Sequence, residues 1–223
     1  MFLFLSYIYT NIILLKAFFV FIFCCSSLFC LSQQTEEFVQ VKNYYNQHRN
    51  MLGTEFKKKY HAEKKASAQL AIQQDFLLFM KKMDSIENVA LIGALVKVKN
   101  LEDLSKIQPK TPNSPIATIT ENRSNEEVSA AYPGGTNVLK QEIADLFYGE
   151  AVYSEAKKVT SKVVFVVECD GKISNVNAEG DNFTFNRQAE IALYSISKQF
   201  SPATIKGTLV RYRFTLPLTL NFE

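Results

Sequence analysis

The sequence has few of the residues that build covalent or metal-based sites. It contains no Trp, two His and four Cys, and three of the Cys lie within residues 24–30 of an apolar N-terminal run. Cys169 is the one cysteine beyond that run, so it has no partner there for an internal disulfide. No Cys/His cluster has the spacing of a zinc site. We therefore expect no metal and no other cofactor, and a fold held together by its hydrophobic core.

The charge balance is close to neutral and excludes some classes of partner. The formal net charge is +3, from 25 basic and 22 acidic residues. Nucleic-acid binding needs a concentrated basic face, so we expect no nucleic-acid partner. The densest group of lysines, within residues 57–65, is interspersed with Glu63 and preceded by Glu55. That pattern is typical of a solvated helix face rather than of a partner-binding patch.

No group of residues indicates an enzyme. Catalysis needs a nucleophile with a base, paired carboxylates in a cleft, or a metal. Cys169 stands beside Asp170, but both histidines, His48 and His61, lie far earlier in the chain. The glycines at positions 134 and 135 lack the Lys-Ser/Thr of a phosphate-binding loop. We therefore assign no catalytic, cofactor-binding or metal-binding residue.

The N-terminal residues 1–32 are predicted to be an export signal or a membrane anchor. Residues 1–31 are apolar apart from Lys16, which fits the basic region of a secretory signal peptide. Cys30 and Ser32 would then be the small residues before cleavage at Gln33. The alternative is an uncleaved membrane helix of about 20 residues. A charge at the centre of such a helix costs about 2.5–3.5 kcal/mol, which favours cleavage.

Residues 33–106 are predicted to be mainly helical, because apolar residues recur there at helical spacing. Gly53 is a predicted break between two helices. The segment 89–98 fits either a buried strand or a helix interrupted by Gly93. Residues 107–131 contain three prolines followed by polar residues, and we interpret them as a linker.

Residues 132–223 are predicted to form an α+β domain with two helices and three antiparallel strands. A Pro-Gly-Gly turn precedes the first helix, which Thr136 or Asn137 can cap. Strands are expected at 161–168 and 172–178, joined by a two-residue hairpin turn at Asp170 and Gly171. A second helix follows Asp181-Asn182 and is expected to run to the Ser-Pro pair at 201–202.

The final strand, residues 210–222, alternates strictly between apolar and other side chains, so one face is buried and one exposed. Pro217 has no N–H to donate and therefore indicates a sheet edge. An open edge is a template for pairing with another chain. The exposed set is our candidate partner-binding site: Arg211, Arg213, Thr215, Pro217, Thr219 and Asn221. The two arginines either pair with an acidic peptide or discourage edge-to-edge aggregation.

The order of helix, hairpin, helix and long final strand resembles the C-terminal domain of the TonB family of energy transducers. The resemblance covers residues 133–223. The residues that carry it are Pro133-Gly134-Gly135, Val163 to Val167 with Asp170-Gly171 and Ile173, Phe200-Ser201-Pro202, and Tyr212-Arg213-Phe214-Thr215-Leu216-Pro217.

The resemblance implies a non-catalytic domain in the periplasm or cell envelope of a Gram-negative bacterium. It implies a protein partner, such as the peptide of a TonB-dependent outer-membrane transporter, bound by β-strand addition to the final strand. Two alternatives stay open. The chain can be an energy transducer anchored in the inner membrane, although no His precedes His48 and the family's long Pro-rich spacer is missing. It can also be a structural homodimer. Membrane contact is expected only through residues 1–31, if they are uncleaved.

Overall fold

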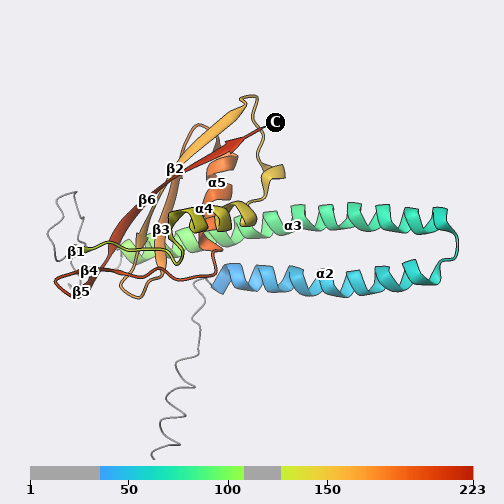
Figure 1. Ribbon diagram of the computed structural model, residues 1–223, viewed down its shortest axis with the longest axis horizontal. Helices are drawn as coiled ribbons and strands as arrows, with labels where there is room; N and C mark the ends of the chain where they lie inside the picture. Colours follow the sequence, from blue (N-terminus) through green and yellow to red (C-terminus); the bar gives the residue numbers. More distant parts are fainter. Residues whose placement is uncertain (1–35, 108–126, 223) are drawn as a thin grey trace, which may run out of the picture. The chain divides into compact units, whose positions relative to one another are not determined.

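The computed structural model describes residues 36–107 and 127–222, all of which belong to one compact unit, residues 33–223. The predicted signal or anchor lies outside the described residues. Within the described ranges, no helix is long and apolar enough to span a membrane. The fold is α+β, as predicted: two long helices precede two three-stranded antiparallel sheets that carry further helices (Figure 1).

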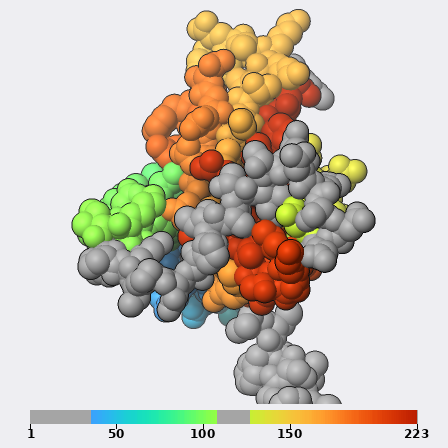
Figure 2. Space-filling view, turned by 90° about the vertical axis from the view of Figure 1, so that its left-hand side faces the viewer, coloured from blue at the N-terminus to red at the C-terminus, as the bar shows by residue number. Residues whose placement is uncertain are grey.

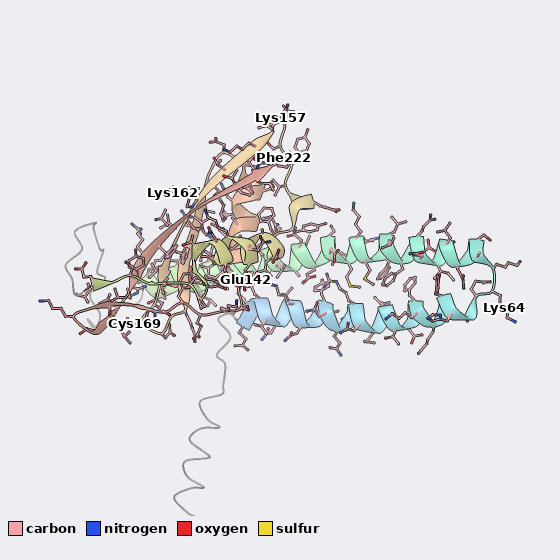
Figure 3. All side chains as sticks on the ribbon, viewed as in Figure 1. Lys64, Glu142, Lys157, Lys162, Cys169 and Phe222 are labelled. Carbon is pink, nitrogen blue, oxygen red and sulfur yellow. The ribbon has the colours of Figure 1, made fainter. Side chains whose placement is uncertain are left out.

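The helical region is a hairpin of α2 (Glu36–Ala62) and α3 (Ala66–Ile107). The two helices pack along each other, with the rings of Phe56 and Phe76 4.9 Å apart. The connection is short, and Lys64 lies at the tip of the hairpin (Figure 3). The Glu63 carboxylate accepts hydrogen bonds from the backbone N–H groups of Lys64 and Lys65, at 2.8 and 2.9 Å.

Neither glycine of the hairpin interrupts its helix. The predicted break at Gly53 is wrong, because α2 continues through it to Ala62. The segment 89–98 is helical, because α3 runs through Gly93. A glycine inside a helix costs only about 1 kcal/mol, which the packing of two long helices outweighs.

The larger sheet has the strand order β3-β2-β6, with β2 (Lys158–Val167) between β3 (Ile173–Glu179) and β6 (Tyr212–Asn221). Alternate side chains of β2 are buried along its whole length. Helices α4 (Gly135–Leu146) and α5 (Phe183–Tyr194) supply apolar side chains to the same core. The predicted domain of two helices and three antiparallel strands is therefore present.

A smaller sheet was not predicted. Its order is β1-β4-β5, from β1 (Glu127–Val128), β4 (Ala203–Ile205) and β5 (Thr208–Val210). Strand β1 falls within the range interpreted as a linker. The predicted single strand over 210–222 is two strands, since β5 ends at Val210 and β6 begins at Tyr212.

The hairpin turn between β2 and β3 is longer than predicted. The N–H of Gly171 donates to the carbonyl of Glu168 at 2.9 Å, and the N–H of Glu168 donates to the carbonyl of Lys172 at 2.7 Å. Gly171 has a φ of 81°, whereas Asp170 is not among the residues with positive φ. This pattern is a three-residue loop, a type I turn followed by a left-handed glycine, so the predicted two-residue turn is wrong.

Helix α5 ends at Tyr194 and not near Phe200 as predicted. Backbone N–H groups beyond its end bind elsewhere: that of Ser197 donates to Glu142 at 2.7 Å, and that of Phe200 donates to the carbonyl of Gly171 at 3.0 Å. A longer helix would have to give up both bonds. Phe200 is nevertheless buried, as its spacing predicted.

Candidate functional site

Strand β6 forms one edge of the larger sheet. Its ladder with β2 keeps one register from the pair Lys158–Asn221 to the pair Val167–Tyr212. No strand of the described ranges pairs with its other side. The predicted edge position of the strand that contains Pro217 is therefore confirmed.

The direction in which the backbone N–H and C=O groups of β6 point can be deduced from a hydrogen bond of β3, the strand at the opposite edge of the sheet. The N–H of Ala178 in β3 donates to Glu190 at 3.0 Å and therefore points away from β2. Its partner in β2 is Val163, whose own N–H and C=O must then point towards Leu216 of β6. Because the direction alternates along an antiparallel strand, the odd-numbered residues of β6 direct their backbone groups to the open edge. Pro217 is one of them, so its missing N–H breaks no bond to β2.

The structure brings five of the six predicted site residues together on this edge. The exposed side chains of β6 belong to Arg213, Thr215, Pro217, Thr219 and Asn221. They alternate with side chains that face the core, so they lie on the sheet face opposite the helices.

Arg211 is placed differently. It lies between β5 and β6 and is partly buried. Its guanidinium donates two hydrogen bonds to the carboxylate of Glu168, both at 2.6 Å. These bonds raise the pKa of Arg211, and its charge is balanced within the chain. Of the two arginines, Arg213 is the one that faces solvent at the edge.

The opposite edge of the sheet, β3, is covered by side chains. A bulge at Asn175, which has a φ of 52°, shifts the register of β3 against β2. Three backbone N–H groups of β3 donate to side chains: Asn175 to Glu102 (2.9 Å), Val176 to Tyr194 (3.1 Å) and Ala178 to Glu190 (3.0 Å). The carbonyl of Val176 accepts from Lys99 at 3.1 Å. An incoming strand would have to break these bonds.

Two of the residues that cover β3 come from α3 and two from α5. The C-terminal end of α3, shown in green, lies beside the orange residues of the sheet domain in Figure 2. Glu190 of α5 is fully buried, and its ion pair with Lys99 of α3, at 2.8 Å, joins the two helices. It also pairs with Arg187 of its own helix at 2.6 Å. Helix α3 is therefore bound to the sheet by charged groups as well as by apolar contacts.

Beside the open edge lies a groove of about 300 Å³ that the sequence did not predict. Its walls are α4, Phe185 of α5 and the C-terminal half of β6. The lining residues are Lys140, Ile143, Ala144, Phe147, Phe185, Pro217, Leu218, Thr219 and Leu220. The spacing of the α4 residues, three or four apart, is the signal that could have indicated this face. An added strand would direct alternate side chains into the groove.

Glu142 holds α4 in position beside the groove. Its carboxylate accepts hydrogen bonds from the backbone N–H and the hydroxyl of Ser197, at 2.7 and 2.8 Å, and from the hydroxyl of Tyr132 at 2.5 Å. Burial acts to raise the pKa of Glu142, but the bonds from Ser197 and Tyr132 outweigh it and lower this pKa below its usual value. The carboxylate therefore stays ionised as it binds the segment after α5.

The candidate site offers backbone pairing and an apolar groove. In the described part of the chain, no group of His, Cys, Asp and Glu is arranged to hold a metal ion. Cys169 lies in the β2–β3 turn, where its thiol is 3.7 Å from the carbonyl of Leu209. No protein-family model, curated protein or solved structure matches the chain.

Proposed function

We propose that this chain is a TonB-like binding protein of the Gram-negative cell envelope, and that it engages a partner by β-strand addition at β6. The partner is an extended segment of an outer-membrane transporter or of another envelope protein. One observation carries the proposal: the odd-numbered residues of β6 direct their backbone groups outward, whereas the N–H groups along β3 are already bonded to side chains. The sheet thus has one edge ready to pair.

The two faces of an added strand would meet different surroundings. Main-chain hydrogen bonds supply affinity in this mode of recognition, and side-chain pockets supply specificity. Side chains on the helix side would enter the groove between α4 and β6, which favours apolar residues. On the outer face they would lie near Arg213, with Lys158 and Lys162 on the neighbouring strand, which favours acidic residues. Figure 3 shows Lys162 on this sheet.

A photo-crosslinking amino acid at Thr215 tests the proposal in cells. We expect it to give an adduct with an extended segment of an envelope protein, mapped by mass spectrometry. The matched control is the same substitution at Asn177, an exposed residue on the opposite edge strand, which should give little adduct. Adducts of similar yield from both edges would contradict the proposal, and adducts between two copies of the chain would instead indicate the homodimer.

The substitution Thr219→Pro separates pairing from proximity. Residue 219 directs its N–H to the open edge, so proline should leave the ladder to β2 intact and the chain folded. It removes one backbone donor from the edge, and its ring obstructs an incoming strand. We expect the Thr215 adduct to fall about tenfold, which corresponds to about 1.4 kcal/mol of lost binding. An unchanged yield would show that the partner does not bind by strand addition.

A further inference from the structure

A second groove runs along α3, away from the β6 edge. It consists of two adjoining hollows of about 540 and 600 Å³ that share Asn88 and Ala151. One wall is α3 from Leu78 to Asn100. The other wall consists of η1 (Gly149–Ala151), Tyr148 before it, and the first turns of α5. At ~1.5 Å per residue, the α3 wall is roughly 33 Å long, which suits a helix and exceeds a small molecule. We call it the α3 groove.

Several large apolar side chains that line the α3 groove are exposed to solvent. Leu78 is 68% exposed, Val89 66% and Val96 53%, and Phe183 on the opposite wall is 69% exposed. The three α3 residues are 11 and 7 positions apart and therefore share one helix face. Single exposed apolar residues need no explanation, but Val89, Ile92 and Val96 recur three and four positions apart along α3, and such an apolar stripe marks an interaction surface.

The rim of the α3 groove is cationic. It is lined by Lys81, Lys82, Lys99 and Arg187. The carboxylates paired with them are Glu150, which also lines the groove and lies 2.9 Å from Lys81, and the buried Glu190, which Lys99 and Arg187 share. Four cations against two carboxylates leave a net positive charge around an apolar floor.

We propose that the α3 groove binds an amphipathic helix with acidic flanks from a partner protein. An apolar helix face would cover the row of exposed side chains, in the manner of helix-in-groove recognition. Glutamates or aspartates on either side would meet the cationic rim. Charge favours such a partner over two occupants from the chain itself. Two copies that met groove to groove would bring like charges together, and residues 1–31 contain Lys16 and no acidic residue.

Two synthetic 18-residue peptides test the proposal on the full chain by fluorescence anisotropy. Both carry Leu at positions i, i+3 and i+7, one with Glu and one with Lys flanks. We expect the Glu-flanked peptide to bind the wild-type protein and the Lys-flanked peptide to bind at least about tenfold more weakly, a difference that salt reduces. Equal binding of both peptides, or binding of neither, would overturn the proposal.

Substitutions assign the binding to the groove. Val96→Asp should weaken the Glu-flanked peptide about tenfold, because it places a carboxylate among the acidic flanks. Leu104→Asp is the matched control, since Leu104 is similarly exposed on α3 but lies outside the groove. Equal effects of both variants would overturn the proposal. So would a wild-type dimer that Val96→Asp converts to monomers, because the occupant would then be a second copy. Neither result bears on pairing at β6.

Discussion

Replacing Glu190 by alanine is expected to lower the free energy of unfolding by about 2–4 kcal/mol. Glu190 is fully buried, and its carboxylate binds Lys99, Arg187 and the backbone N–H of Ala178. Truncation leaves both cations without their shared partner and one backbone donor without an acceptor. The two cations keep contact with solvent, so the loss comes mainly from the hydrogen bonds of the buried carboxylate and from the buried N–H of Ala178, which is left without an acceptor.

Urea denaturation of the Glu190→Ala variant measures this loss, and amide hydrogen exchange locates it. Exchange should accelerate at Val176 and Ala178, because α3 and α5 then cover the β3 edge less well. The matched control is Asp103→Ala, which removes an exposed ion pair with Lys106 near the same end of α3. The urea concentration at the unfolding midpoint of Asp103→Ala should match that of the wild type. A Glu190→Ala variant that is equally stable would show that the ion pairs do not bind α3 to the sheet.

Replacing Gly171 by alanine is expected to lower the free energy of unfolding by about 2–5 kcal/mol, from two causes. Gly171 has a φ of 81°, where an L side chain adds about 1–2 kcal/mol. A Cβ at this position would also lie 2.2 Å from the carbonyl oxygen of Phe200, which is backbone and cannot rotate aside. Forcing such a contact apart adds about 1–3 kcal/mol. The hydrogen bond from Phe200 to Gly171 would be strained as well.

Gly207→Ala separates the two causes. Gly207 has a φ of 76°, close to that of Gly171, but a Cβ there would have no heavy atom within 4 Å. We expect it to cost about 1–2 kcal/mol, the conformational part alone. Thermal and urea denaturation of both variants gives the difference. Equal losses of unfolding free energy in the two variants would show that the backbone at Phe200 is not packed closely against Gly171 in the β2–β3 turn.

The sequence predicted the elements whose signals are local. The strict alternation of residues 210–222 and the proline at 217 indicated an edge strand, and β6 is one. The glycine at 171 marked the turn between β2 and β3. It could not give the turn length, because Asp-Gly fits both a two-residue and a three-residue loop, and the pairing of Glu168 with Lys172 decides between them.

The features that were missed depend on residues far apart in the sequence. Helix α5 stops at Tyr194 because Glu142 binds the N–H of Ser197, and helical spacing alone continues past that point. Arg211 looked like part of an exposed strand face, but Glu168 holds it in an ion pair. The covering of β3 by Lys99 and Glu102 joins residues more than 70 positions apart. The periodicity of apolar residues in the sequence does not indicate contacts of this kind.

The open edge of β6 is the central claim, and residue-resolved amide hydrogen exchange of the monomeric chain tests it most directly. The amides of Phe214, Leu216 and Leu218 should exchange slowly because they bond to β2, whereas those of Thr215 and Thr219 should exchange rapidly. Of these five amides, a bound extended peptide should slow the exchange of Thr215 and Thr219 only. Slow exchange at these two residues in the free monomer, or rapid exchange at Leu216, would contradict the account.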